Sequence, residues 1–211
     1  MKNINIDFYN KNADNLSETY NSLLTEDVHS HILNQINKAN GKILDIGCGS
    51  GRDAFYFAEK GYKVVAVEPA DKLLKKAKEK HTHKNITYIN DKLPELNNIK
   101  SKEKYDYILM SAVWMHIPSE QRKEAMNKLT SLLKPQGKMF ISLRFGSFND
   151  DRKEIQVSKE EIDNFIEDLK GFDCHELKSD SEKDQLNRNE VSWKTVVIKN
   201  KNKPKLSKKL K

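Results

Sequence analysis

The chain has 211 residues and carries 38 Lys and Arg against 31 Asp and Glu, a net charge of +7. This length suits one domain, and 36% hydrophobic with 33% charged residues indicates a globular, polar protein rather than a disordered one. The sequence has no apolar run of the roughly 18 residues that span a membrane and no apolar N-terminal signal. Cys48 and Cys174 are too few for a disulfide framework or a cysteine zinc site, so we expect a cytoplasmic protein.

The excess positive charge belongs to the C-terminus. Residues 199–211 hold seven lysines and no acid, so residues 1–198 carry equal numbers of basic and acidic side chains. We predict one folded domain over 1–198 and a disordered tail over 199–211. The tail could contact nucleic acid electrostatically, but the neutral body shows no basic stripe, which argues against a dedicated nucleic-acid domain.

Short β-branched runs alternate with helical patterns along the body. Residues 13–36 predict a largely helical segment within an N-terminal helical lid over residues 1–38. Strands are predicted by the apolar runs at 42–46, 62–67, 86–89, 105–110, 138–143, 172–177 and 193–198. Helices are predicted between them at 52–60, 71–80, 119–133 and 159–169. We expect Ser119 to cap the third of these helices, Pro135-Gln136-Gly137 to end it, and residues 145–151 to form a flexible loop.

Strands that alternate with helices favour an α/β fold with a doubly wound parallel sheet covered on both faces. The last two predicted strands have no helix between them. They should form an antiparallel hairpin at one edge, which makes the sheet mixed.

The strongest motif follows the first predicted strand, where residues 43–53 read ILDIGCGSGRD. Gly47, Gly49 and Gly51 let the backbone approach a ligand, and the helix that begins near Gly51 directs free N–H groups at it. Glu68 ends the second strand, where a carboxylate can accept hydrogen bonds from both hydroxyls of a ribose. The two features together predict a nucleoside-containing cofactor.

Two cofactor classes fit this motif. Residues 49–54 satisfy the alanine variant of the G-x-G-x-x-G dinucleotide pattern, which is typical of nicotinamide-dependent oxidoreductases. Asp45 lies just before the loop, where an acid suits a cationic ligand better than a pyrophosphate. S-adenosylmethionine carries a sulfonium and an ammonium group and no phosphate.

The segments ILDIGCGSGRD, VVAVEPA, YDYILMSAVWMHIP and LLKPQGKMFISL together resemble the class I S-adenosylmethionine-dependent methyltransferases, most strongly over residues 40–145. The resemblance, closest to stand-alone bacterial members, implies a Rossmann-like, three-layer αβα fold. Its seven strands would follow the order 3-2-1-4-5-7-6 with strand 7 antiparallel. The cofactor would be S-adenosyl-L-methionine.

The resemblance also implies where the cofactor lies. Gly47, Gly49 and Gly51 would line its methionine portion, with Asp45 near the ammonium group, and Glu68 would hold the ribose hydroxyls. Asp91 would reach the adenine amino group. This chain has Asn90-Asp91 at that point, whereas a Gly-Asp pair would mark the adenine contact more clearly. The remaining expected cofactor contacts are Cys48, Arg52, Pro69, Leu93, Ser111 and Ala112.

Methyl transfer from a sulfonium mainly requires an acceptor held in line and water excluded, with a general base only where the acceptor loses a proton. We therefore name His116 as a candidate base, or a residue that orients the following helix. Arg144 is a candidate to bind a carboxylate or phosphate of the acceptor, or else it forms a surface ion pair. If Arg144 and Arg188 converge, the acceptor is a small anion. Further candidate substrate contacts, with core packing as the alternative for the aromatic rings, are Tyr9 and Tyr20 of the lid, Trp114, Arg188 and Trp193.

Other chemistry is disfavoured. The pairs His29/His31 and His81/His83 lack a third ligand, so we expect no metal site, and Cys48 without a neighbouring base is a packing residue rather than a nucleophile. The prediction is methyl transfer to a small-molecule acceptor. The alternatives are a methyltransferase acting on RNA or protein, a nicotinamide-dependent oxidoreductase and a non-catalytic cofactor-binding module.

Overall fold

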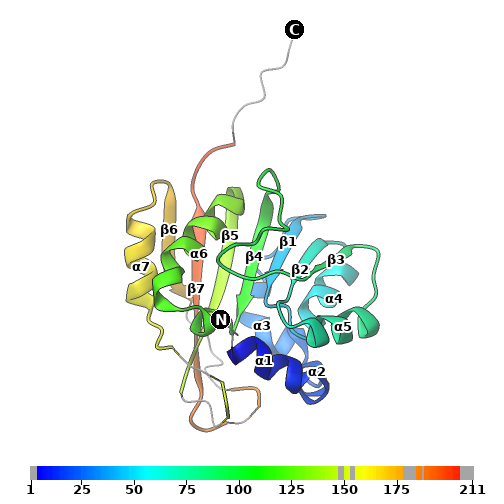
Figure 1. Cartoon of the computed structure of the whole chain (residues 1–211). Coiled ribbons are helices and arrows are strands. Elements are labelled where there is room, and N and C mark those ends of the chain that lie inside the picture. Colours follow the sequence, from blue (N-terminus) through cyan, green and yellow to red (C-terminus); the bar gives the residue numbers. More distant parts are fainter. Residues whose placement is uncertain (1–3, 147–149, 153–154, 178–183, 187, 205–211) are drawn as a thin grey trace.

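The computed structural model describes residues 4–146, 150–152, 155–177, 184–186 and 188–204. A seven-stranded sheet runs through it in the order β3-β2-β1-β4-β5-β7-β6 (Figure 1). The strands β1 to β5 are mutually parallel, and β7 pairs antiparallel with both β5 and β6. The strands are β1 (Lys42–Ile46), β2 (Lys63–Val67), β3 (Ile86–Ile89), β4 (Tyr105–Ser111), β5 (Leu133–Phe145), β6 (Phe172–Leu177) and β7 (Ser192–Asn200). The predicted strand order and the antiparallel strand 7 are confirmed.

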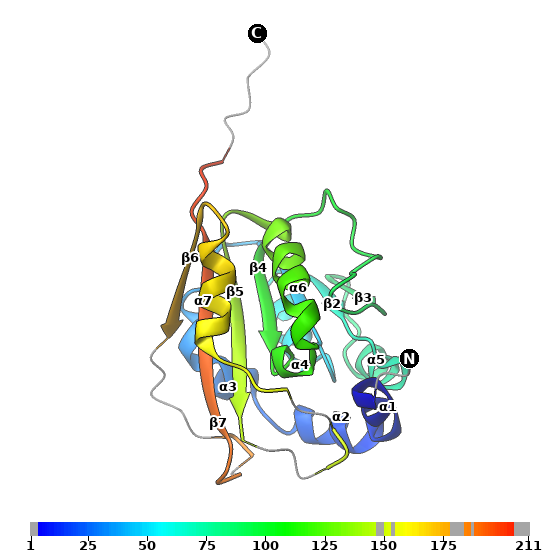
Figure 2. The ribbon, with the colours of Figure 1, turned by 60° about the vertical axis from the view of Figure 1, so that its left-hand side comes forward.

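Helices cover both faces of the sheet, because alternate residues of each strand are apolar and buried. Ile108 and Met110 of β4 pack on one face with α6 and α7, whereas Tyr107 and Leu109 pack on the other with α3 and α4. Figure 2 shows α6 and α7 in front of the sheet and α3 and α4 behind it. The helices are α3 (Thr25–Leu33), α4 (Arg52–Glu59), α5 (Asp71–Lys80), α6 (Ser119–Leu132) and α7 (Lys159–Glu167).

The N-terminal segment forms three separate helices, whereas the sequence predicted one largely helical segment over residues 13–36. A first helix, α1 (Ile4–Lys11), precedes the predicted region, and α2 (Ala13–Asn21) is separated from α3 by three residues. Both α1 and α2 pack against α5. These two helices lie at the carboxyl-end edge of the parallel strands, at the bottom of Figure 1.

Two local predictions around α6 are corrected. Pro118 rather than Ser119 occupies the N-cap position, and the Ser119 hydroxyl instead lies 3.4 Å from the Glu120 carboxylate. Strand β5 begins at Leu133 rather than Lys138, because Leu133 already pairs with Tyr105 of β4. Residues 135–137, which were expected to end the helix, fall inside that strand, and Gln136 there has a φ of 65°.

The predicted boundary of the basic tail is also wrong. Lys199 and Asn200 belong to β7, and Asn200 is buried with its side-chain Nδ2 donating to the Leu133 carbonyl at 3.3 Å. Residues 205–211, and residues 147–149 of the predicted loop, lie outside the described residues. None of the described helices is both long and apolar enough to cross a membrane.

Candidate active site

The loop after β1 requires glycine at three of its positions. Gly47, Gly49 and Gly51 have φ angles of 68°, 54° and 78°, which side chains rarely tolerate. A Cβ on Gly47 would lie 2.4 Å from Cγ2 of Val113. The Gly47 and Cys48 N–H groups donate to the Val67 carbonyl at 2.8 and 2.9 Å, which fixes the loop against the end of β2.

Glu68 follows β2 and faces this loop. Its Oε2 accepts a hydrogen bond from the Gly49 N–H at 3.1 Å, and its Oε1 accepts one from the Ala70 N–H at 2.9 Å. The side chain lines a cavity but the residue is only 5% exposed. Burial raises the pKa of Glu68 to about 7, against the opposing effect of the two N–H groups. The carboxyl group therefore changes charge near neutral pH.

Asp45 lies behind the loop in β1 and is buried. Its Oδ2 accepts no hydrogen bond from any residue that the structure describes. Burial, followed by the nearby Asp53 and Glu68 carboxylates, raises the pKa of Asp45 well above its usual range, although Arg52 opposes this. Burying a carboxylate oxygen that accepts no hydrogen bond costs free energy, so this position suits a cationic group.

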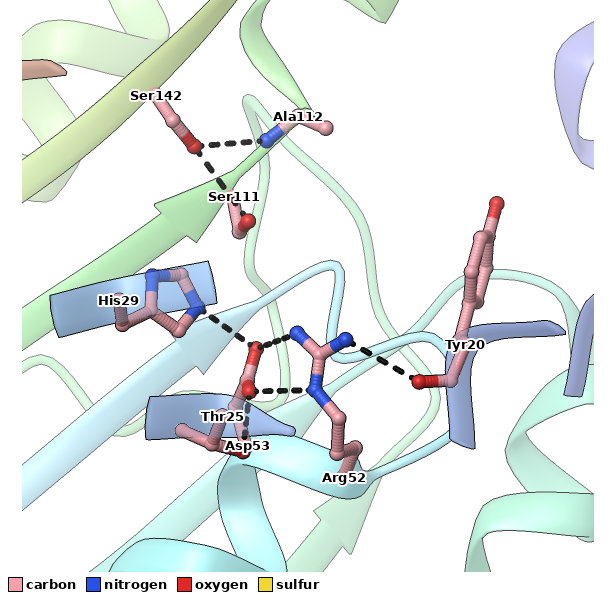
Figure 3. Close-up of polar contacts among 8 residues, drawn as sticks. All are labelled: Tyr20, Thr25, His29, Arg52, Asp53, Ser111, Ala112 and Ser142. Atoms are coloured by element: carbon pink, nitrogen blue, oxygen red, sulfur yellow. Dashed lines mark hydrogen bonds and ion pairs between the residues drawn. The ribbon is translucent and has the colours of Figure 1, made fainter. Parts of the chain in front are cut away.

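A charged cluster fastens the N-terminal segment to the start of α4 (Figure 3). Arg52 donates from Nε and Nη2 to the Asp53 carboxylate at 2.8 and 2.9 Å, and from Nη1 to the Tyr20 carbonyl at 3.1 Å. The Thr25 hydroxyl donates to Asp53 Oδ1 at 2.9 Å, and His29 Nε2 lies 3.0 Å from Oδ2. The Asp53 carboxylate thus binds α3 to the start of α4, and Arg52, which that carboxylate orients, binds the end of α2.

The electrostatics of Asp53 favour its ionised form. Burial alone would raise its pKa, but His29 and Arg52 outweigh this effect and hold the pKa far below the usual range. Asp53 therefore stays charged over the ordinary pH range, and its partners stay bound to it.

A cavity of about 1050 Å³ opens at the carboxyl-end edge of the sheet. Its walls come from the glycine-rich loop, Glu68, the residues after β4, the ends of β5 and β7, and helices α1 and α2. At the end of β4, the Ser142 hydroxyl accepts a hydrogen bond from the Ala112 N–H at 3.3 Å and lies 3.4 Å from the Ser111 hydroxyl (Figure 3). Sixteen of the predicted site residues line this cavity: Tyr9, Tyr20, Gly47, Cys48, Gly49, Arg52, Glu68, Pro69, Asp91, Leu93, Ser111, Ala112, His116, Arg144, Arg188 and Trp193.

Residues 43–137 match the family model described as a methyltransferase domain. They contain the glycine-rich loop, Glu68 and the strands β1 to β4 that surround one half of the cavity. These residues, slightly under half of the chain, form a methyltransferase domain, and the seven-strand order around them matches the class I S-adenosylmethionine-dependent methyltransferase fold.

Two curated proteins and one solved structure are similar to this methyltransferase. An uncharacterized methyltransferase of Alkaliphilus oremlandii is 27% identical over 136 residues, which covers 64% of this chain and 61% of that protein. A ubiquinone biosynthesis O-methyltransferase of Coxiella burnetii is 29% identical over 113 residues, which covers 53% and 47%. The chain therefore spans about half to three fifths of the length of these relatives.

The structural comparison extends over nearly the whole chain. Burkholderia thailandensis 1,6-didemethyltoxoflavin-N1-methyltransferase, solved with 1,6-didemethyltoxoflavin and S-adenosylhomocysteine, superposes with a TM-score of 0.68 and 15% identity. The match covers 94% of this chain and 88% of that one. At this identity the likeness establishes the fold alone.

At one end of the cavity of this methyltransferase, Asp91 follows β3. Its carboxylate accepts hydrogen bonds from the backbone N–H groups of Lys92 at 2.9 Å and Asn98 at 2.6 Å. Both oxygens therefore hold the loop after β3, while Asp91 and Leu93 remain on the cavity wall. The adenine contact assigned to Asp91 stays a prediction.

At the other end, both ring nitrogens of His116 face α1. Asn5 Nδ2 lies 3.1 Å from Nδ1, and the Tyr9 hydroxyl lies 3.1 Å from Nε2. Because Nδ1 accepts from the Asn5 amide, a neutral His116 carries its proton on Nε2 and donates it to Tyr9. Arg152 also approaches the Tyr9 hydroxyl, at 3.4 Å, so this tyrosine is held from both sides.

The two arginines expected to converge both line the cavity, but one of them is bound to an acid. Arg188 donates from Nε and Nη2 to the Asp184 carboxylate at 2.9 and 2.6 Å, and Trp193 Nε1 donates to the same group at 3.0 Å. Burial alone would raise the pKa of Asp184, but Arg188 and Trp193 lower it to about 2. Arg144 is buried, and its Nη1 donates to the Gly146 carbonyl.

Three predicted residues do not line the cavity. Trp114 is fully buried in the core with its Nε1 donating to Glu161 at 3.1 Å, so its role as a pocket wall is wrong. Gly51 ends the loop as the N-cap of α4, where a Cβ would meet the Tyr88 hydroxyl at 2.8 Å. Asp45 lies behind the loop, as described above, and its suggested contact with an ammonium group stays a prediction.

Sequence reasoning missed several residues that shape the site. Arg152, Asp184 and Asn5 line the cavity but belong to no local motif, so nothing in their sequence neighbourhood indicated them. Asp53 stands beside Arg52 in the quoted motif and could have been recognised as an acid at a helix N-terminus. The histidine pairs have ordinary partners: His29 binds Asp53, His31 lies 2.8 Å from the Thr195 hydroxyl, and His81 lies 2.7 Å from Asn21 Oδ1.

Proposed function

We propose that this protein transfers the methyl group of S-adenosylmethionine to a small, anionic acceptor molecule. The observation that carries the proposal is the cavity at the carboxyl-end edge of the sheet. It joins the glycine-rich loop and Glu68 at one end to Arg144 and Arg152 at the other. A volume of about 1050 Å³ is at the upper end of the roughly 300–1,000 Å³ typical of ligand pockets, which fits a cofactor together with a small acceptor.

The residues present fit the cofactor. Gly47 and Gly49 would lie against its methionine portion, and the buried, donor-free Oδ2 of Asp45 would balance its ammonium group. Glu68, ionised, would accept hydrogen bonds from the ribose hydroxyls. When bound, S-adenosylmethionine supplies an electrophilic methyl group and a neutral thioether leaving group.

An anionic acceptor is favoured by the charges at the other end of the cavity. Arg144, Arg152 and Arg188 line it there, Arg152 in an ion pair with Asp150 and Arg188 in one with Asp184. Guanidinium groups bind carboxylates and phosphates in a planar, bidentate geometry, so these three side chains suit an acceptor that carries such a group. Two similar proteins, a ubiquinone biosynthesis O-methyltransferase and a 1,6-didemethyltoxoflavin-N1-methyltransferase, bear the names of small-molecule enzymes, which favours a small acceptor here.

The roles of His116 and Tyr9 follow from their hydrogen bonds. With its proton on Nε2, His116 acts by holding the Tyr9 hydroxyl over the cavity rather than by removing a proton from the acceptor. Tyr9 and Tyr20 then close the N-terminal helices over the site and exclude water. Transfer requires no general base unless the acceptor atom must lose a proton.

A calorimetric titration of the purified protein with S-adenosylhomocysteine, with NAD as the control ligand, tests the cofactor assignment. Micromolar binding of S-adenosylhomocysteine alone is the expected result. Binding of NAD alone would instead select the oxidoreductase alternative, and binding without turnover on any acceptor would select the non-catalytic module.

A screen with methyl-labelled S-adenosylmethionine tests the acceptor class. Small carboxylates and phosphates are expected to become labelled, and uncharged analogues of the same acceptors much less so. The Arg144→Lys variant keeps the charge but loses the planar fork, so its KM for the acceptor should rise while its affinity for S-adenosylhomocysteine stays unchanged. Labelling of RNA or protein in place of small molecules would overturn the proposal.

A further inference from the structure

Lysines that are scattered along the sequence gather at the edge of the sheet opposite the cavity. Strands β1 and β2 begin with Lys42 and Lys63, which lie side by side in the parallel register. Lys84 immediately precedes Asn85, whose carbonyl accepts a hydrogen bond from the Val64 N–H at the start of β2. Lys100 lies in the segment that leads into β4. We call these four residues the lysine edge.

The lysine edge surrounds a second cavity, of about 360 Å³. Side chains of Thr87, Asn85 and Asn98 complete its polar lining. Glu103 is the only acid among its lining residues, and its carboxylate binds Lys42. The cavity therefore has an excess of three positive charges.

The other three lysines of the edge are available to a ligand. Lys63, Lys84 and Lys100 are exposed, and none forms an ion pair with any residue that the structure describes. Lys38 and Lys201, at the same end of the sheet, are instead paired with Asp106 and Asp173. The positive charge at this edge therefore comes from Lys63, Lys84 and Lys100, a local excess that the neutral net charge of the body conceals, contrary to the expectation that the body has no basic stripe.

The surroundings favour a polyanion in water over a membrane. The large apolar side chains that the described chain exposes are Ile4 and Leu24, and both belong to the N-terminal segment at the opposite edge. The lysine edge thus has no such side chain to insert into lipid. Its lysines and side-chain amides instead match phosphates flanked by sugar hydroxyls and base edges.

We propose that the lysine edge binds single-stranded RNA, with one nucleotide held in the second cavity and neighbouring phosphates on the surrounding lysines. A cavity within the usual size range of ligand pockets can receive a splayed nucleotide of a single strand, whereas the stacked bases of a duplex cannot enter it. This goes beyond the proposed function. The RNA lies about five residues of strand away from the methyl-transfer cavity, roughly 15 Å, so it is a tether and not the acceptor.

The test measures fluorescence anisotropy of a labelled uridine oligomer of about 20 nucleotides, titrated with the full chain at several salt concentrations. The key variant carries Lys63→Glu, Lys84→Glu and Lys100→Glu. A matched control carries Lys11→Glu, Lys72→Glu and Lys75→Glu, three exposed lysines of α1 and α5 at the opposite edge. Both variants change the net charge by the same amount, and S-adenosylhomocysteine binding checks that each is folded.

Wild-type protein should bind the oligomer at low salt. The lysine-edge variant should weaken binding at least about tenfold and make the slope of log K against log salt less steep by about 2, while the control stays within about threefold. No saturable binding by the wild type, or equal weakening by both variants, would overturn the proposal. Preferential binding of vesicles containing phosphatidylserine would overturn it in favour of a membrane. Equal binding of the matching DNA oligomer would overturn the assignment to RNA.

Discussion

The two ends of the main cavity are built in different ways. The end assigned to the cofactor consists of the glycine-rich loop and Glu68, which come from two neighbouring strands and meet through backbone N–H groups. The end assigned to the acceptor consists of side chains from segments far apart in the chain. The Tyr9 hydroxyl lies 3.1 Å from His116 Nε2 and 3.4 Å from Arg152 Nη1, although Tyr9 is 107 and 143 residues away from them in the sequence.

This difference separates what must stay constant from what can vary. The three glycines of the loop tolerate almost no substitution, because each has a left-handed φ at which an added Cβ strains the backbone. Side chains such as Arg144 and Arg152 can be exchanged without moving a strand. We therefore expect substitutions at the first end to abolish cofactor binding, and substitutions at the second end to change the acceptor.

The largest effect is expected for Gly47→Ala. The new Cβ would lie 2.4 Å from Cγ2 of Val113 in a backbone with a φ of 68°. Backbone strain and overpacking together should lower the free energy of unfolding by about 3–5 kcal/mol. Binding of S-adenosylhomocysteine should disappear in calorimetry.

Gly61→Ala is the matched control for that variant. Gly61 has a φ of 87°, but a Cβ there meets nothing closer than Asn40 Oδ1 at 3.7 Å. It should cost about 1–2 kcal/mol from the backbone alone and leave cofactor binding intact. Adding Val113→Ala to Gly47→Ala should recover part of the lost stability. Equal behaviour of Gly47→Ala and Gly61→Ala would show that the loop does not need the close approach.

The next largest effect is expected for Asp53→Asn, which removes the charge that links α3 and α4. Weaker hydrogen bonds to Arg52 and His29 should lower the free energy of unfolding by about 2–3 kcal/mol at pH 7. Cofactor affinity should fall as well, because the N-terminal helices lose their attachment. Asp14→Asn is the control: Asp14 is an exposed acid that binds Lys76, and its removal should leave the melting temperature unchanged.

The pH dependence of the free energy of unfolding tests the role of Asp53 further. The pKa of Asp53 is held below its usual value in the folded protein, so its contribution is present above about pH 4 and is lost as the pH falls further. Chemical denaturation at pH 7 and pH 3 should therefore show a larger loss of stability for the wild type than for Asp53→Asn. An equal loss would mean that the cluster does not attach the N-terminal segment.

Most of the sheet could be predicted from the sequence, because each strand is a short apolar run bounded by polar or turn residues. Strands β1, β3 and β6 begin and end where the pattern predicts. The errors occur where tertiary contacts override local pattern. Pairing of Leu133 with Tyr105 extends β5 through a segment that reads as a turn, and burial of Asn200 extends β7 into the basic tail.

The sequence predicts those site residues that lie close together in the chain. The glycine-rich loop and Glu68 lie within one strand–loop–helix–strand unit, so their spacing in the sequence indicates their position in space. Trp114 and Arg188 show the limit of this reasoning. One is buried against Glu161 and the other is bound by Asp184, and both partners lie in segments without a motif. The lysine edge was missed for the same reason, since its members come from four separate segments.

A smaller effect is expected for the pH dependence of cofactor binding. If the ionised form of Glu68 holds the ribose, binding favours the deprotonated state, and affinity must rise as the pH passes upward through the pKa of about 7. Affinity for S-adenosylhomocysteine should increase about tenfold between pH 6 and pH 8 and then level off. Glu68→Gln should bind about tenfold more weakly at pH 8 and show no such rise. Glu95→Gln, an exposed acid outside the cavity, should behave as the wild type, and a flat wild-type profile would reject the ribose assignment.

The smallest effect is expected from shortening the C-terminus, provided that the truncation leaves β7 intact. Removing residues 205–211 should leave the melting temperature, S-adenosylhomocysteine affinity and turnover of a small acceptor unchanged, because both ends of the main cavity lie at the opposite edge of the sheet. Removing residues 199–211 instead deletes Asn200, whose buried amide donates to the Leu133 carbonyl. That cut should lower the free energy of unfolding by about 1–3 kcal/mol. Thermal melts of the two truncations side by side measure the difference. A loss of cofactor affinity with the shorter cut would show that the basic tail reaches the cavity, and the separation between the two edges of the sheet would no longer hold.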